Sequence, residues 1–233
     1  MNTKFSDAII VQKKKGITPV IPDIKCVSPK EGDLLCGRDP VKIAQLLTQM
    51  AGAPVLSVVT EPKEFGGSIE LLKQVKDITN CPVLRKDFIE SRADLLETKK
   101  AGADAVLLMC AVLPENRLKE YYEMALELDL EPLVETHTKE EMLFAKELGA
   151  GLVGINNRDI LSLEKDEGTV LRTDSIAVFK PENSILISES SIQSREDVET
   201  AVRAGADAAL VGTAIWKAED MVSFYHTLCG MKK

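Results

Sequence analysis

Charged and polar side chains stand at or just past the ends of several short apolar runs in this 233-residue chain. They are Asp23, Lys25, Lys86, Glu135, Asn156, Arg158 and Glu189. Two lysines and several carboxylates around one opening could bind an anionic substrate and exchange protons with it. Neighbouring cations also lower the pKa of a lysine towards the range useful for acid–base catalysis. The residue types therefore predict proton-transfer chemistry, although their spacing assigns no role to any single group.

A second pattern follows the last two apolar runs. Ser190-Ser191 and Gly212-Thr213 each come after such a run and before a helical stretch. Backbone N–H groups in loops of this kind, together with a helix N-terminus, bind phosphate dianions. We therefore expect a phosphorylated small molecule as the partner of this chain.

The elements that would position these groups are marked by a phrase that occurs four times. Each copy joins a helix-like stretch to an aliphatic run through a Gly-Ala pair, and the copies begin at Met50, Lys100, Glu147 and Arg203. Glycine just past a helix is a common stop signal, and a continuous aliphatic run is typical of a strand covered on both faces. Each copy therefore predicts a junction between a helix and a parallel strand.

Eight apolar runs have the length of a strand. They are Val20–Lys25, Val55–Thr60, Val83–Lys86, Ala105–Met109, Leu133–Thr136, Leu152–Asn156, Ile185–Glu189 and Ala208–Gly212. Their starts lie on average about 27 residues apart, which is the spacing of βαβ units. Eight such units predict an α/β fold, a single-domain (β/α)8 TIM barrel over residues 19–233, preceded by a short N-terminal segment, residues 1–18. A doubly wound sheet is disfavoured because the chain has no G-x-G-x-x-G motif.

Composition excludes several classes of protein. The formal net charge is -8 and no basic stripe is present, so a nucleic-acid partner is not expected. No apolar run approaches the roughly 20 residues that cross a bilayer, so no membrane partner is expected either. Five scattered cysteines without a C-x-x-C pair are interpreted as reduced thiols. We therefore expect a cytoplasmic protein, either a monomer or a homodimer.

Six motifs, in order along the chain, resemble the strand-end motifs of the indole-3-glycerol phosphate synthase family of tryptophan biosynthesis. They are Asp23-Ile-Lys-Cys-Val-Ser-Pro-Lys, Phe65-Gly-Gly-Ser, Pro82-Val-Leu-Arg-Lys-Asp-Phe, Gly154-Ile-Asn-Asn-Arg-Asp, Ser188-Glu-Ser and Gly205-Ala-Asp-Ala-Ala-Leu-Val-Gly. The resemblance spans the barrel from Pro19 to about Asp220. It implies closure of the pyrrole ring of 1-(2-carboxyphenylamino)-1-deoxyribulose 5-phosphate, with loss of carbon dioxide and water and with no cofactor or metal.

The resemblance also implies roles for individual residues. Lys86 would be the general acid that protonates the substrate ketone, Lys25 would hold the anionic groups, and Glu135 would assist the dehydration. Asp23 and Asn156 would complete the catalytic set. The implied substrate-binding residues are Phe65, Arg158, Glu189 and Ser190, and the implied phosphate-binding residues are Ser28, Ser191, Gly212 and Thr213.

The chain departs from the family pattern in four places. Asp23 stands where the family has Glu, Cys26 where it has a basic residue, and Ser191 where it has Gly. The N-terminal extension that usually caps the barrel mouth is also shorter. These departures keep two alternatives open: a diverged lyase or isomerase for another phosphorylated sugar, and a non-catalytic barrel that binds a phosphorylated metabolite. His137, two residues after Glu135, is interpreted as a surface or supporting histidine.

Overall fold

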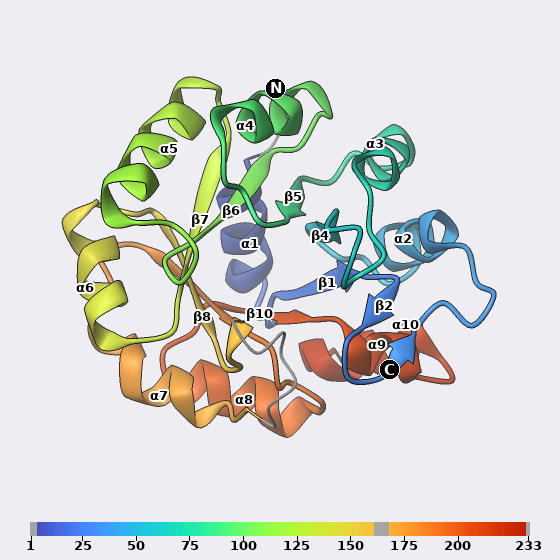
Figure 1. The fold of residues 1–233 in the computed structure, drawn as a ribbon. Coiled ribbons are helices and arrows are strands. Elements are labelled where there is room, and N and C mark those ends of the chain that lie inside the picture. Colours follow the sequence, from blue (N-terminus) through green and yellow to red (C-terminus); the bar gives the residue numbers. More distant parts are fainter. Residues whose placement is uncertain (1–3, 161–167, 232–233) are drawn as a thin grey trace.

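Eight parallel strands close into a barrel in the computed structural model, which describes residues 4–160 and 168–231 (Figure 1). The order around the barrel is β1, β10, β9, β8, β7, β6, β5 and β4. These strands are β1 (Val20–Ile24), β4 (Leu56–Val59), β5 (Val83–Lys86), β6 (Ala105–Met109), β7 (Glu131–Thr136), β8 (Leu152–Asn156), β9 (Ile185–Glu189) and β10 (Ala208–Val211). The predicted (β/α)8 TIM barrel is confirmed.

Helices follow the barrel strands and form the outer ring (Figure 1). They are α2 (Pro40–Gln49), α3 (Ile69–Ile78), α4 (Arg92–Lys100), α5 (Glu115–Glu127), α6 (Lys139–Glu147), α7 (Leu171–Ala177), α8 (Arg195–Arg203), α9 (Thr213–Lys217) and α10 (Met221–Cys229). Serine or threonine caps with an acidic residue three positions later begin α4, α6 and α8. The glycines of the four repeated phrases have φ values of 73°, 85°, 72° and 105°, as expected for glycine that ends a helix.

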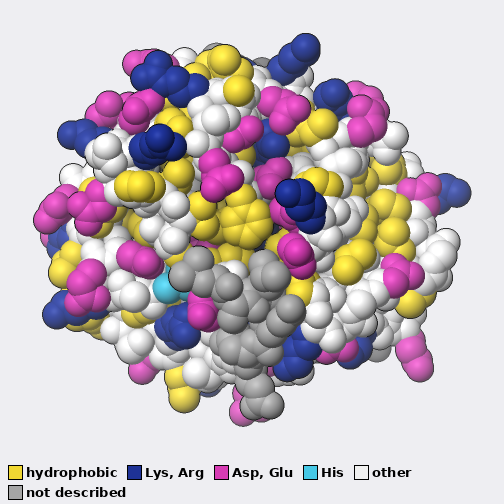
Figure 2. All heavy atoms as spheres, viewed as in Figure 1, with side chains coloured by type: hydrophobic (Ala, Val, Ile, Leu, Met, Phe, Trp, Pro, Cys, Tyr) yellow, Lys and Arg dark blue, Asp and Glu magenta, His cyan; other side chains and the backbone are white. Residues whose placement is uncertain are grey.

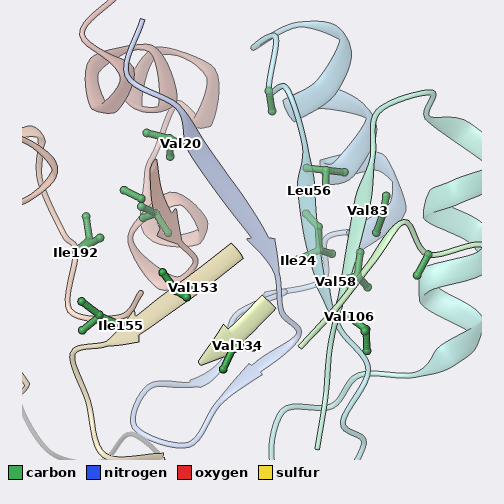
Figure 3. Packing of buried hydrophobic residues seen from close by; sticks show 14 of the residues in the cluster. Val20, Ile24, Leu56, Val58, Val83, Val106, Val134, Val153, Ile155 and Ile192 are labelled. Atoms are coloured by element: carbon green, nitrogen blue, oxygen red, sulfur yellow. The ribbon is translucent and has the colours of Figure 1, made fainter. Parts of the chain in front are cut away.

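Two apolar layers hold the barrel together. Side chains that point outwards from the strands, such as Val58, Val106 and Val153, pack beneath the helices (Figure 3). Side chains that point inwards, such as Ile21 and Leu133, fill the barrel interior. The alternation along each strand explains why the sequence runs are apolar throughout, because both faces of every strand are buried.

The segment before the barrel forms helix α1 (Phe5–Lys14). Phe5 and Ile9 are 0% and 1% exposed and join the interior layer. The hydroxyl of Ser6 bonds Glu131 at the start of β7, and Lys13 pairs with Asp207 just before β10. Helix α1 therefore covers the amino ends of the strands, opposite the end where the charged groups were expected.

A small hairpin, β2 (Val27–Ser28) with β3 (Gly32–Asp33), follows β1 and was not predicted. Its two-residue strands are too short to give a periodic pattern. The backbone N–H of Val27 donates to the carbonyl of Phe65, which ties the hairpin to the loop after β4. All five cysteines are free thiols. Within residues 4–160 and 168–231, no helix combines the length and the apolar character needed to span a bilayer.

Candidate active site

A cavity of about 370 Å³ opens at the carboxyl ends of the strands. Hydrophobic side chains gather at the centre of the face shown in Figure 2, with basic and acidic side chains beside them. The predicted site residues on the cavity wall are Asp23, Lys25, Phe65, Lys86, Arg158, Ser190, Ser191, Gly212 and Thr213. A pocket of this size, apolar with a few convergent charges, is typical of a site for a small molecule.

Four other predicted residues are not on this wall. Glu135, Asn156 and Glu189 are fully buried at the ends of β7, β8 and β9, next to wall residues. Ser28 lies in the β2–β3 hairpin, where its hydroxyl accepts a hydrogen bond from the backbone N–H of Glu31 at 3.4 Å. The two buried carboxylates therefore lie next to residues that line the cavity, without lining it themselves. Ser28 stabilises the hairpin.

Lys86 lies between two buried carboxylates. Its Nζ is 3.6 Å from Oε2 of Glu135 and 3.6 Å from Oε2 of Glu189, and both acids are 0% exposed. Gly154 of β8 provides the space for Glu189, because a Cβ on this glycine would lie 2.2 Å from Oε1 of Glu189. Lys86 reaches the cavity wall at 12% side-chain exposure, so this ammonium can meet a ligand while its carboxylate partners cannot meet water.

Arg85, the neighbour of Lys86, points the opposite way. Its guanidinium bonds Thr60, Thr98 and Asp87 on the outer side of the strand. The hydroxyl of Thr60 also donates to Asp87 at 2.6 Å. Sequence analysis grouped the adjacent charges at this strand end, but the period-two alternation separates them into a cavity lysine and an outward arginine.

Lys25 lies over the ring of Phe65 on the cavity wall. Nζ of Lys25 is 5.6 Å from the centre of the Phe65 ring, within the range of a cation–π contact. The Phe65 loop is held by Glu61, whose carboxylate accepts hydrogen bonds from the backbone N–H groups of Lys63, Glu64 and Phe65 at 2.9, 2.7 and 3.0 Å. Sequence reasoning missed Glu61, although its place directly after a strand and before a Pro-containing loop was a usable signal.

Asp23 is 4% exposed and lies on the same wall as Lys25, as their two-residue spacing predicted. Its Oδ1 accepts a hydrogen bond from the hydroxyl of Ser57 at 2.7 Å. A Cβ on Gly212 would lie 3.3 Å from the Cβ of Asp23, so this aspartate packs close to the loop expected to bind phosphate. The indole N–H of Trp216 donates to the Asp23 carbonyl at 2.9 Å and fixes the backbone there.

The two asparagines after β8 differ in their surroundings. Oδ1 of Asn156 accepts from the backbone N–H of Arg158 at 3.0 Å, while Nδ2 of Asn156 has no hydrogen-bond partner among the described residues. Asn157 bonds Ser188, Ser190 and Thr173 and joins β8 to β9 and α7. Asn156 is therefore the one of the pair that keeps a polar atom available near the cavity.

The Ser190-Ser191 loop has a demanding backbone. Both residues have positive φ, 65° and 58°, a region that residues other than glycine seldom adopt. The Ser191 hydroxyl accepts a hydrogen bond from Nε of Arg158 at 3.3 Å. Successive positive-φ residues before a helix turn their N–H groups towards one side, which suits an anion.

Several wall residues were not predicted. Phe88, Met109, Ile160 and Leu210 supply apolar surface, and Phe88 was visible in the strand-end motif that contains Lys86. Glu31 of the hairpin loop and Lys217 of α9 form an ion pair of 2.9 Å at the rim, and hydrogen bonding and charge from Lys217 lower the pKa of Glu31. This pair has no local sequence signal because its members are far apart in the chain. In the part of the chain that the structure describes, no group of three or more acidic, histidine or cysteine side chains is arranged to hold a metal.

Comparisons with known proteins agree with this geometry. A family model described as indole-3-glycerol phosphate synthase matches residues 2–228. An indole-3-glycerol phosphate synthase of Thermococcus kodakarensis is 44% identical over 216 residues, covering 93% of this chain and 94% of that protein. One of Pyrococcus furiosus is 44% identical over 208 residues, covering 89% and 90%.

A solved structure confirms the fold alone. The thiamine phosphate pyrophosphorylase from Pyrococcus furiosus superposes with a TM-score of 0.64, covering 91% of this chain and 93% of that one. Its sequence identity of 16% is too low to carry an argument about the reaction.

Proposed function

Because this chain belongs to the indole-3-glycerol phosphate synthase family, we propose that its cavity closes the pyrrole ring of 1-(2-carboxyphenylamino)-1-deoxyribulose 5-phosphate, with Lys86 as the general acid. The activity is that of a carboxy-lyase of tryptophan biosynthesis. The observation that supports the role of Lys86 is the position of its Nζ, 3.6 Å from each of two buried carboxylates and on the cavity wall. The ammonium is the form of a lysine side chain that can donate a proton.

The first step forms a carbon–carbon bond. The anthranilate ring carbon attacks the ketone carbon, the carbonyl electron pair moves to oxygen, and Lys86 gives that oxygen a proton. An ammonium both donates the proton and stabilises the developing negative charge. Loss of carbon dioxide then returns the electron pair of the broken bond to the ring.

The last step removes water: the bond between carbon and the hydroxyl oxygen breaks as that oxygen takes up a proton, and the neighbouring CH2 carbon gives up a proton as the pyrrole double bond forms. We assign this step to Glu135, which is within reach of Lys86 and shielded from solvent, with Asn156 orienting the intermediate. Asp23 completes the catalytic set, and its bond to Ser57 sets its position beside Lys25. Aspartate is one methylene shorter than glutamate, so the Asp23 carboxylate stays closer to its own strand. More of the contact with the substrate therefore falls to Lys25.

The substrate lies across the cavity in this proposal. Its phosphate binds the backbone N–H groups of the Ser190-Ser191 and Gly212-Thr213 loops. Its anthranilate ring lies against Phe65, with Arg158 and Glu189 on the same side, and Lys25 holds the anionic groups. Ser28 acts on the phosphate indirectly, through the hairpin.

The wider setting is part of the same proposal. We place the protein in the cytoplasm, as a monomer or homodimer that acts on a small phosphorylated substrate without a cofactor. Analytical ultracentrifugation of the purified protein measures the oligomeric state directly.

The test is turnover of the carboxyphenylamino-deoxyribulose phosphate, followed by the fluorescence of the indole product. Lys86→Ala should abolish turnover and leave binding of inorganic phosphate measurable, whereas Lys25→Ala should weaken substrate binding as well. Lys73→Ala is the matched control, because Lys73 is an exposed lysine of α3. Full activity in Lys86→Ala, with circular dichroism showing a folded protein, would contradict the assignment.

A further inference from the structure

The charged cluster around Lys86 continues beyond Glu135 to a histidine. Nε2 of His137 is 3.7 Å from Oε1 of Glu135, on the far side of that carboxylate from Lys86. Nδ1 of His137 is 3.6 Å from Oε2 of Glu141 in the first turn of α6. The imidazole is only 9% exposed, so it is almost as buried as the acid beside it. Glu141, His137, Glu135 and Lys86 therefore form a chain of alternating acidic and basic groups that ends at the cavity.

The position of the imidazole is fixed locally. Glu141 accepts hydrogen bonds from the backbone N–H groups of His137 and Thr138, and the Thr138 hydroxyl accepts from the N–H of Glu141. This capping box holds the start of α6 and keeps the Glu141 carboxylate beside Nδ1 of His137. The other ring nitrogen, Nε2, faces Glu135 at 3.7 Å.

The electrostatic surroundings favour the imidazolium. Burial lowers the pKa of His137, but bonding to Glu141 and the charges of Glu135 and Glu141 outweigh it, so the pKa is raised. Arg172 of α7 acts in the opposite direction and does not reverse the result. Cys110, after β6, lies near the same two glutamates, and burial with their charge raises the pKa of its thiol, which therefore stays neutral.

We propose that His137 is a positioning residue for the ring-closure reaction, holding the Glu135 carboxylate towards Lys86 and balancing its charge. This inference rests on the proposed function, because it concerns the same carboxylate. Neither oxygen of Glu135 accepts a hydrogen bond from the described residues, so the carboxylate is held by its two cationic neighbours and by packing. Lys86 lies 3.6 Å from both Glu135 and Glu189, and His137 adds a second basic group beside Glu135. Without the imidazole, the Glu135 carboxylate would lose a neighbour that fixes its direction.

Two substitutions of His137 distinguish the effect of the hydrogen-bond donor's position from the effect of the side chain's charge. In His137→Gln the side-chain amide can reach the place of Nε2 and donate to Glu135 without a charge, whereas in His137→Asn it can reach only the place of Nδ1. We expect kcat to fall about tenfold in His137→Asn and by less in His137→Gln, with KM nearly unchanged in both. His226→Gln is the matched control, because His226 lies on α10 and contacts the Ala51 carbonyl. Thermal unfolding of all three variants shows whether each is folded.

The pH profile supplies a readout that a purely structural role would not change. The raised pKa keeps the imidazolium to a higher pH than in a free histidine, and the imidazolium is lost as the pH rises through that pKa. We therefore expect kcat to decline across that ionisation in the unsubstituted protein. The same decline should be missing in His137→Gln. The chain has only two histidines, so the His137 ring signals in an NMR titration are assigned by their loss in this variant. We expect the titration midpoint of His137 to lie above the value of about 6.5 for a free histidine.

The outcomes distinguish the two proposals. Absence of turnover in the folded, unsubstituted protein would contradict the proposed function itself. Normal turnover, with His137→Gln and His137→Asn both matching the unsubstituted kcat and pH profile, would overturn only the positioning role. A His137 midpoint below that of free histidine would overturn it as well, and this measurement stands even if a variant fails to fold.

Discussion

At the amino ends of the strands the barrel is filled by Phe5 and Ile9 of α1, and the carboxylates there are fully engaged. Asp207 accepts hydrogen bonds from the backbone N–H of Leu186 at 2.9 Å and from Lys180 at 3.1 Å, and it also pairs with Lys13. At the carboxyl ends, Glu135 and Asn156 are 0% exposed, against 18% for the Asp207 side chain, yet polar atoms of both have no hydrogen-bond partner among the described residues.

This difference shows where the molecule gives up stability. A buried polar atom without a hydrogen bond costs about 1–3 kcal/mol, so an arrangement that keeps several of them is expected where a ligand will meet them. Among the residues that the structure describes, the amino end has no such unpartnered atom and closes the core. We therefore expect substitutions at the amino end to change the free energy of unfolding and substitutions at the carboxyl end to change turnover.

The largest effect is expected at the amino end. Phe5→Ala should lower the free energy of unfolding by about 3–5 kcal/mol, because Phe5 is 0% exposed and its removal leaves a cavity in the barrel interior. Urea denaturation measures the change. Both kcat and KM of the folded fraction should stay as they are. A large fall in kcat at temperatures where the variant is folded would break the division between the two ends.

The next effect is expected at the carboxyl end, without any change in charge. Gly154→Ala places a methyl group where Oε1 of Glu189 now lies, at 2.2 Å, so Glu189 must move relative to Lys86. A misplacement of about 1 Å near reacting groups can lower kcat by about a hundredfold. Steady-state kinetics test this, with Gly151→Ala as the control, because a Cβ on Gly151 meets no atom within 4 Å. Equal kcat values in the two variants would show that the position of Glu189 does not matter.

The same division explains what the sequence could predict. The barrel strands follow from aliphatic runs buried on both faces, and β5, β6, β8 and β9 have the predicted bounds. Lys86 points inwards and Arg85 outwards because successive residues of a strand alternate in direction. The sequence analysis grouped these adjacent charges and did not assign a direction to either. Burial of α1 was not predicted, although its buried residues Phe5, Ala8, Ile9 and Gln12 are spaced as one face of a helix.

The contacts of His137 were also not predicted, although both of its acidic partners lie within four residues of it in the sequence. The part of His137 depends on distances to side chains from two elements, and only the folded geometry supplies them. The roles expected for the site residues remain predictions of the resemblance and of the geometry together. Phosphate binding by Ser28 is one of these predictions, and its hydroxyl accepts a hydrogen bond from the backbone N–H of Glu31 in the hairpin.

A smaller, pH-dependent effect is expected for Asp207. Burial raises the pKa of this carboxyl, but hydrogen bonds from Leu186, Lys13 and Lys180 outweigh burial and lower it. Its contribution is therefore present above the unfolded-state pKa of about 3.9 and is lost as the pH falls through the lower folded-state value. Asp207→Asn should cost about 1–3 kcal/mol at neutral pH and nothing at strongly acid pH. Denaturation curves between pH 7 and pH 2 test this, and a difference that is independent of pH would refute the role of the charge.

The smallest effect is expected in the Ser190-Ser191 loop at the carboxyl ends of the strands. This loop has backbone strain in addition to buried polar groups nearby. Ser191 has a φ of 58°, and glycine adopts this conformation without steric cost, so Ser191→Gly should stabilise the fold by about 1 kcal/mol. Removing the side chain also lets a phosphate approach the backbone more closely, so kcat/KM should rise. Asn183→Gly is the control, because Asn183 has a φ of 62° in an exposed turn outside the cavity. It should leave kcat/KM unchanged. If kcat/KM falls in Ser191→Gly alone, the hydrogen bond from Arg158 to the Ser191 hydroxyl contributes more to kcat/KM than relief of the backbone strain does.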